Sequence, residues 1–173
     1  AGLALWGEAD TRFLVATSQG AFRTASVVVA TGGLAVPQLG ATSFGYEVAR
    51  QFGLRVVPPA PALVPLTLAP GTLASLAPLA GVALEARVTC DGGPGASFRD
   101  RVLVTHKGLS GPAVLQVSSY WQRQRMRSGR DGPVTVDLIP GEDAEAWVEA
   151  RRDSRALLAN VLAEHLPRRF AHE

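Results

Sequence analysis

The sequence has one cysteine and one methionine among 173 residues, and it has no long apolar run. Cys90 has no second thiol with which to form an internal disulfide, and a thiolate metal cluster is excluded for the same reason. The apolar stretches are short and broken by proline or glycine, whereas a membrane-spanning helix needs about 20 apolar residues. The opening residues lack the basic and apolar parts of a signal peptide. We therefore expect no metal site, no membrane partner and a cytoplasmic setting.

The sequence also lacks a large excess of charge of one sign. The 17 Lys and Arg residues and 15 Asp and Glu residues give a net charge of +2. This excess is too small for a typical nucleic-acid-binding surface, so we expect no nucleic-acid partner. The composition, 47% apolar and 18% charged, is typical of a folded protein of one domain or of two small pieces. Because Met126 is the only methionine, we expect Ala1 to be an internal position of a longer chain.

The first sixty residues predict part of an α/β domain. Residues 13–25 predict a hairpin, because apolar and polar residues alternate on both sides of a glycine turn. The β-branched run at 27–30 predicts a strand buried on both faces of a parallel sheet. Residues 45–52 predict an amphipathic helix that ends at a glycine, and 54–57 predict another short strand.

A proline-rich segment between residues 58 and 65 indicates a boundary, because each proline removes a donor and disfavours helix before it. Beyond it, short strands separated by Gly-rich turns predict a small barrel or sandwich. One helix over 113–127 interrupts the strands, with Ser110 as its N-cap and Pro112 in its first turn. A last helical portion is expected from 143 to about 165. The expected strands are 63–68, 82–89, 97–104 and 134–138.

A glycine turn directly follows the expected strand at 27–30. The residues Ala30-Thr31-Gly32-Gly33 would let a cofactor phosphate or ribose approach the backbone closely, because paired glycines carry no side chains. Ligands of open α/β sheets bind at such carboxyl ends of strands. The alternative is an ordinary tight turn, and these residues by themselves favour that alternative, because so short a glycine motif is a weak signal.

Two phosphate-binding motifs are excluded. Residues 40–45 have the glycine spacing of a phosphate-binding loop, but Tyr46 and Glu47 stand where that loop needs Lys and then Ser or Thr. The Rossmann G-x-G-x-x-G pattern between a strand and a helix does not occur in the sequence. A nucleoside-triphosphatase is therefore excluded.

The octapeptide 105–112, Thr-His-Lys-Gly-Leu-Ser-Gly-Pro, combines a titratable histidine, a lysine and a helix start. His106 could exchange a proton, and Lys107 could hold an acidic group beside the free amides of the helix. The alternative is a strand-to-helix corner with exposed side chains. The residues alone favour that alternative, because no carboxylate or nucleophile can be placed beside His106.

Arginines are concentrated where the expected helix at 113–127 ends. They could meet phosphate, but a solvated helix end is the favoured interpretation because the net charge is too small for electrostatic steering. The residues are Arg123, Arg125, Arg127 and Arg130.

Four segments, taken in order, resemble one known family. They are residues 30–42, 44–46, 61–66 and 105–112, and the last is specific to the group. Together they resemble the BaiN-like NAD(P)/FAD-dependent oxidoreductases, also called the aminoacetone oxidase family of FAD-binding enzymes. The resemblance covers nearly the whole chain.

This resemblance implies a mixed α+β fold in three parts. Residues 1–60 would belong to a glutathione-reductase-like FAD domain, 61–140 to an inserted β-barrel-like domain, and 141–173 to the start of a helical domain. The dinucleotide fingerprint and a second glycine-rich flavin contact would lie outside the chain. We therefore expect the chain alone to bind flavin poorly and to be inactive.

The resemblance also implies an oxidoreductase with FAD as cofactor and a small-molecule substrate, and it leaves the use of NAD(P) open. It assigns no catalytic residue. The residues that would line the FAD are Ala30, Thr31, Gly32 and Gly33, and the candidate substrate contacts are His106, Lys107 and Ser110.

Two other hypotheses remain open. The chain could be a stand-alone β-rich binding module without redox activity. It could also belong to a flavoprotein that modifies RNA, since FAD-dependent tRNA-modifying enzymes share this type of domain, although the modest charge speaks against it.

Overall fold

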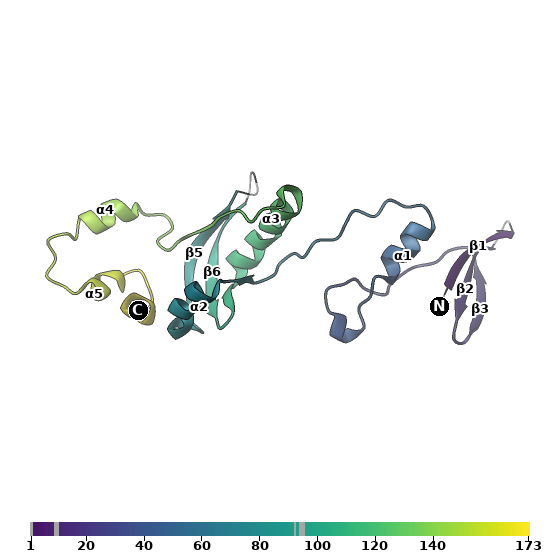
Figure 1. Cartoon of the computed structure of the whole chain (residues 1–173), viewed down its shortest axis with the longest axis horizontal. Helices are drawn as coiled ribbons and strands as arrows, with labels where there is room; N and C mark the ends of the chain where they lie inside the picture. Colours follow the sequence, from purple (N-terminus) through teal and green to yellow (C-terminus); the bar gives the residue numbers. More distant parts are fainter. Residues whose placement is uncertain (1, 9–10, 92, 94–95) are drawn as a thin grey trace. The chain divides into compact units, whose positions relative to one another are not determined.

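The computed structural model describes residues 2–8, 11–91, 93 and 96–173. The chain forms two compact units, Ala1–Pro59 and Ala60–Glu173. Both are shown along the chain in Figure 1. The three-part division expected from the sequence, and the glutathione-reductase-like nature of the first part, stay predictions.

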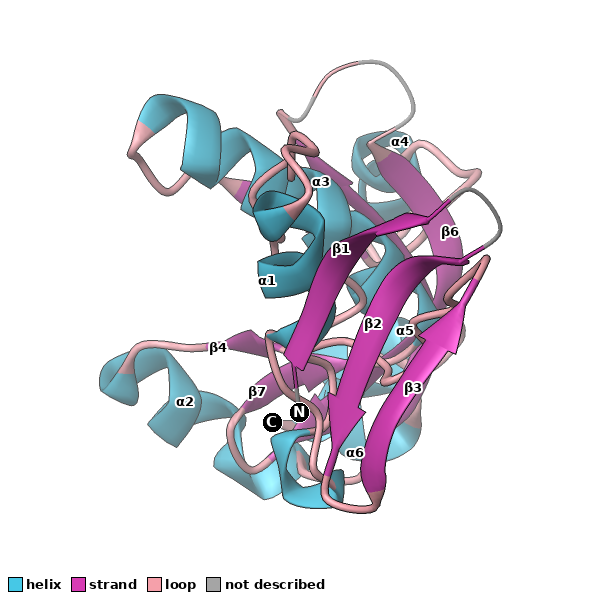
Figure 2. Cartoon of the chain, turned by 90° about the vertical axis from the view of Figure 1, so that its right-hand side faces the viewer, coloured by secondary structure: helices cyan, strands magenta, loops and turns pink. Residues whose placement is uncertain are grey.

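The N-terminal unit is built on a three-stranded antiparallel sheet, seen in Figure 2 with β2 in the middle. The predicted hairpin is confirmed: Thr17 pairs with Gly20, and the Thr17 hydroxyl donates to the Gly20 carbonyl over 3.0 Å. The predicted helix is also confirmed and ends before Gly53, whose φ of +73° suits a glycine. The strands are β1 (Gly2–Glu8), β2 (Thr11–Thr17) and β3 (Gly20–Thr24), followed by the 3-10 turn η1 (Pro37–Leu39) and α1 (Phe44–Gln51).

The strands predicted at 27–30 and 54–57 are wrong, because both segments are irregular. A run of β-branched residues becomes a strand only when another strand supplies hydrogen bonds on at least one side. No strand of the described part of the chain lies beside either segment. As a consequence Val28 is 87% exposed, although its sequence context predicts burial on both faces.

The C-terminal unit is a five-stranded antiparallel half-barrel sheet of order β4-β7-β6-β5-β8. The strands predicted at 82–89, 97–104 and 134–138 are confirmed with small shifts, whereas the one predicted at 63–68 shortens to two residues. The strands are β4 (Leu66–Thr67), β5 (Ala83–Cys90), β6 (Ser97–Thr105), β7 (Gly108–Ser110) and β8 (Val134–Asp137). Between β4 and β5 the chain forms α2 (Pro70–Leu76) and η2 (Ala77–Leu79), which the sequence analysis did not predict.

Helix α3 (Pro112–Ser128) covers the inner face of β5 and β6, as Figure 1 shows. The alternation along β5 turns Ala86 and Val88 inward, where they pack against Val114 and Val117 of the helix. All four are fully buried. Burying a valine side chain contributes about 1.5–3 kcal/mol, so the contact between this sheet face and α3 is a large source of stability of the unit.

The helical portion predicted over 143–165 is divided. The structure has three short helices instead, α4 (Ala144–Glu149), α5 (Leu158–Leu162) and α6 (Arg168–His172). Asp143 starts the first one by accepting a hydrogen bond from the Ala146 amide over 3.1 Å. Pro167, predicted to end the helical portion, instead precedes α6, where its fixed φ and missing donor are tolerated.

The buried hydroxyl of Ser118 ties the proline-rich segment to α3. It accepts the Val64 amide over 3.0 Å and donates to the Leu115 carbonyl over 2.7 Å. We expect Ser118→Ala to lower the free energy of unfolding by about 1–3 kcal/mol, because it leaves the Val64 amide without its partner. The more exposed Ser119 accepts the Leu63 amide over 3.2 Å and provides the control. Denaturant unfolding should show a clearly smaller loss for Ser119→Ala, and equal losses would contradict the assignment.

Candidate functional site

The predicted cofactor segment, residues 30–33, lies in the N-terminal unit against the start of α1. A Cβ on Gly33 would lie 3.3 Å from the Tyr46 hydroxyl, and a Cβ on Gly45 would lie 3.6 Å from Val29. In the sequence, Gly45 and Tyr46 stand at the end of a glycine-spaced segment, in the expected helix and in the family pattern. The contacts of Tyr46 with Gly33 and of Gly45 with Val29 are not visible in the sequence alone.

The backbone of this segment has few partners among the described residues. Within the described residues, the amides and carbonyls of residues 27–33 form no backbone hydrogen bond. Gly32 has a φ of +73°, and nothing lies within 4 Å of the place where its Cβ would be. Ala30, Thr31 and Gly32 are exposed and Gly33 is half-buried. The arrangement can accept polar groups on the main chain without steric hindrance from side chains.

The candidate substrate residues lie in the C-terminal unit, at the hairpin that joins β6 to β7. His106 and Lys107 form its two-residue turn, and both side chains are exposed. The Thr105 hydroxyl closes the turn by accepting the Lys107 amide over 3.2 Å and donating to the Gly108 carbonyl over 3.0 Å. The structure therefore brings His106 and Lys107 together at an exposed tip.

Ser110 is not the N-cap that the sequence predicts. It is the last residue of β7, opposite Leu103, and Gly111 takes the cap position with no side-chain hydrogen bond. Pro112 is in the first turn of the helix, as predicted. Within the part of the chain that the structure describes, the side chains of Ser110, His106 and Lys107 form no hydrogen bond or ion pair with one another. They do not make up a nucleophile–base pair.

Two glycines of this octapeptide are required by close backbone crossings. A Cβ on Gly108, whose φ is +145°, would overlap the Leu66 carbonyl of β4. A Cβ on Gly111, whose φ is +94°, would lie 2.6 Å from the Arg101 carbonyl of β6. The unusual composition of residues 105–112 is thus explained largely by the path of the backbone, and only the turn at 106–107 presents chemistry to solvent.

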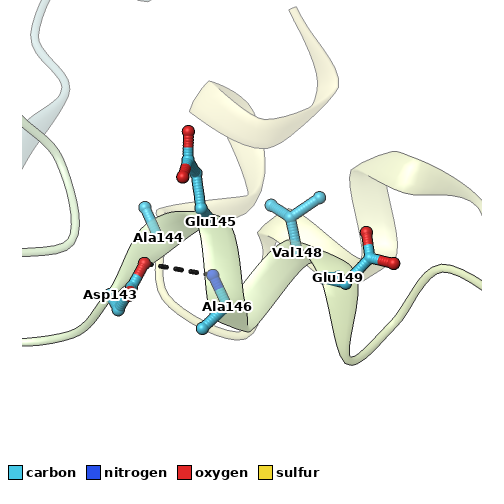
Figure 3. Close-up of a pocket in the computed structure, with 6 residues that line it drawn as sticks. All are labelled: Asp143, Ala144, Glu145, Ala146, Val148 and Glu149. Carbon is cyan, nitrogen blue, oxygen red and sulfur yellow. Dashed lines mark hydrogen bonds between the residues drawn. The ribbon is translucent and has the colours of Figure 1, made fainter.

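Other hollows of the C-terminal unit lack converging chemical groups. A hollow of about 710 Å³ beside α4 carries the carboxylates of Asp143, Glu145 and Glu149, but Figure 3 shows these side chains spread along the helix. A second cavity, of about 210 Å³, is lined only by apolar side chains of the half-barrel and of α2 and α6. Among the described residues, no group of His, Cys, Asp and Glu side chains could hold a metal ion. No helix in the described part of the chain has the length and apolar character needed to cross a bilayer.

A third hollow, of about 340 Å³, lies at the C-terminal end of α3. Two arginines of the cluster at the end of the expected helix, Arg123 and Arg127, line this concave surface. Its lining residues are Asp91, Gly93, Arg123, Gln124, Arg127 and Ser128.

The half-barrel with its following short helices defines the class of the protein. Residues 60–173 match the family described as "HI0933-like protein barrel and H2TH domain". The chain belongs to this HI0933-like family. This finding supports the expected barrel followed by helices, while membership of the narrower BaiN-like group goes beyond it.

Several relatives carry enzyme names. The chain is 46% identical over 146 residues to "Ribosomal RNA dihydrouridine synthase" of Escherichia coli K12, which is 83% of this chain and 34% of the relative. It is 38% identical over 163 residues to the protein of the same name from Haemophilus influenzae, which is 92% of this chain and 38% of the relative. It is 31% identical over 134 residues to "3-dehydro-bile acid delta(4,6)-reductase" of Clostridium scindens, which is 76% of this chain and 32% of the relative. The chain spans about a third of the length of these curated relatives.

Proposed function

We propose that this chain is part of a flavin-dependent reductase that acts on a uracil base of ribosomal RNA. The observation that carries the proposal is the 46% identity, over 83% of the chain, to the Escherichia coli protein named for that activity. RNA modification was the alternative that the small net charge disfavoured. The relatives' names outweigh that argument, because a small net charge says little about how charge is distributed over the surface.

The named activities share one kind of chemistry. Dihydrouridine is uridine whose C5–C6 double bond is reduced, and that bond is conjugated to the C4 carbonyl. The name of the Clostridium scindens relative also describes double bonds conjugated to a ketone. Reduction of such a bond adds a hydride to one carbon and a proton to the other. We therefore propose reduction of a carbon–carbon double bond conjugated to a carbonyl as the reaction type.

The N-terminal unit fits the cofactor that this reaction needs. Reduced FAD, when bound, supplies the hydride, and NAD(P)H is the proposed source of its electrons. The segment 30–33 offers main-chain groups without backbone partners among the described residues, and it carries no side chain at Gly32 or Gly33. These features support our proposal that residues 30–33 form one wall of the flavin site. The narrower resemblance to the BaiN-like enzymes points to the same cofactor.

The exposed turn of the C-terminal unit supplies the polar groups that we propose as substrate contacts. Lys107 carries a positive charge that can pair with a phosphate, and the His106 imidazole can form a hydrogen bond with a polar group of the substrate. Both project from a two-residue turn whose backbone is fixed by Thr105. We propose that these two side chains contact the RNA.

The proposal is tested by deleting the gene and measuring dihydrouridine in ribosomal RNA. Nucleosides from purified ribosomal RNA are separated and identified by mass spectrometry. One dihydrouridine should disappear in the deletion strain and return when the complete gene is supplied. The purified complete protein with NADPH should restore the same nucleoside in RNA from the deletion strain. An unchanged nucleoside profile in the deletion strain would disprove the function.

The second candidate function is reduction of the carbon–carbon double bond of a small conjugated ketone. It is supported by the 31% identity to the Clostridium scindens reductase. If this candidate is right, the purified complete protein should oxidise NAD(P)H in the presence of a 3-oxo-Δ4 steroid and leave ribosomal RNA unchanged. If ribosomal RNA is the substrate, the steroid should have no effect on the rate.

A further inference from the structure

We propose that the C-terminal end of α3 is a docking surface for the phosphate backbone of the RNA substrate. This inference rests on the proposed function, because it assumes that RNA is the substrate. It adds the place at which the C-terminal unit holds that RNA, apart from the turn at 106–107.

The first half of α3 is buried and the second half is not. Ala113, Val114 and Val117 are completely covered by the half-barrel, whereas the arginines near the helix end are exposed. Arg123 and Arg127 are four residues apart, so they lie on the same face of the helix. Both line the hollow of about 340 Å³, one side of which is formed by the last turns of α3 and the other by Asp91 and Gly93, which follow β5.

Two arginines of this hollow form no ion pair with any residue that the structure describes. Arg125, on a neighbouring face, is held by Asp131 over 2.9 Å and lies 5.6 Å from the centre of the Trp121 ring. In the part of the chain that the structure describes, Arg123 and Arg127 have no ion-pair partner. Asp91 is the one acidic residue lining the hollow. An anion that enters would meet two guanidinium groups, which bind phosphate in a fixed fork geometry.

The helix dipole alone does not account for this arrangement. It favours positive charge in the last turn of any helix, which Arg125 and Arg127 would already satisfy. A further arginine four residues before Arg127 adds repulsion between like charges. Placing two such side chains on the wall of a hollow is favourable once a polyanion binds there and releases its counterions.

The outer face of the half-barrel is a weaker candidate for the same role. It also carries exposed arginines, but these alternate with acidic residues in register on neighbouring strands. Arg99 is paired with Glu85 over 2.6 Å, and Arg87 stands opposite Asp137. Because its charges are largely balanced, this face supplies a matched control.

The test compares two double variants of the complete protein. One is Arg123→Gln with Arg127→Gln at the α3 hollow, and the other is Arg87→Gln with Arg101→Gln on the outer face of the sheet. Each variant removes the same charge. Binding to a ribosomal RNA fragment is measured at several salt concentrations, and dihydrouridine formation is measured in parallel.

We expect the α3 variant to bind RNA about tenfold more weakly, with a salt slope reduced by about two, and the sheet variant to stay within about twofold of the wild type. Arg123→Lys with Arg127→Lys should recover most of the binding, and unchanged thermal unfolding should show that the fold is intact. Two results would overturn the docking surface but not the proposed function, provided that the wild type still forms dihydrouridine. One is an equal loss of RNA binding in both Gln variants, and the other is no loss of RNA binding in the α3 variant. A wild-type protein that neither binds RNA nor modifies it would overturn the proposed function and this inference together.

Discussion

Replacing Gly108 by alanine is expected to destabilise the half-barrel severely. The new methyl group would overlap the Leu66 carbonyl of β4, and the backbone φ of +145° is one that alanine rarely adopts. Neither the carbonyl nor the paired strand can move without breaking the β4–β7 ladder. We expect a loss of about 3 kcal/mol, combining the cost of backbone strain with that of overpacking.

Gly71 supplies the control for this substitution. It lies in α2, has no positive φ, and has nothing within 4 Å of the place where its Cβ would be. Gly71→Ala should be neutral or stabilise the protein by about 0.5–1 kcal/mol, because glycine is a poor helix former. Thermal unfolding should therefore show a lower midpoint for Gly108→Ala, by about 6–12 °C, and no loss for Gly71→Ala. A Gly108→Ala protein that melts with the wild type would contradict the crossing described here.

The octapeptide 105–112 shows both what the sequence reveals and what it leaves out. Its composition predicts a corner before a helix, and Pro112 does start α3. The three-residue strand β7 is missed, because such a short strand has too few residues to show an alternating pattern. Gly108 and Gly111 are explained by carbonyls of β4 and β6, and the sequence does not show that these strands cross the two glycines.

Strands with one buried face are predicted well, and the reason is physical. In β5 every second residue faces the core, so burial alternates along the strand, and the same period appears in the amino-acid types. The run at 27–30 fails because a continuous apolar segment indicates burial but does not name a partner strand. The long helix expected after residue 143 fails because Asp153 and Ser154, in the middle of it, favour turns over helix.

The candidate site can also be predicted from the sequence only in part. Gly32 and Gly33 can be selected from the sequence because glycines after an apolar run indicate a place where the backbone must be accessible. The contacts of Gly33 with Tyr46 and of Gly45 with Val29 depend on the tertiary fold. The hollow at Arg123 and Arg127 is also tertiary, because the helix pattern gives their common face but does not show that the surface there is concave.

Replacing Gly32 by alanine is expected to weaken flavin binding by the complete protein. Gly32 and Gly53 share a φ of +73°, and neither has an atom within 4 Å of the place where its Cβ would be. Alanine at either position therefore costs about 1–2 kcal/mol of backbone strain, and the two variants should lose similar stability. They differ in their surroundings, since Gly32 lies in the proposed flavin wall and Gly53 follows the end of α1.

If residues 30–33 form the proposed flavin wall, a methyl group at position 32 would occupy space next to the cofactor, and it would favour a different backbone conformation for the amides around it. We expect the Gly32→Ala protein to lose about tenfold or more in flavin affinity, and Gly53→Ala to keep its flavin, which corresponds to a difference of about 1.4 kcal/mol. Flavin content is measured by absorbance after gel filtration, and affinity is measured by titrating the apoprotein with FAD. Equal flavin loss in both variants would show that strain in the N-terminal unit is the cause. Full retention in Gly32→Ala would remove residues 30–33 from the cofactor site.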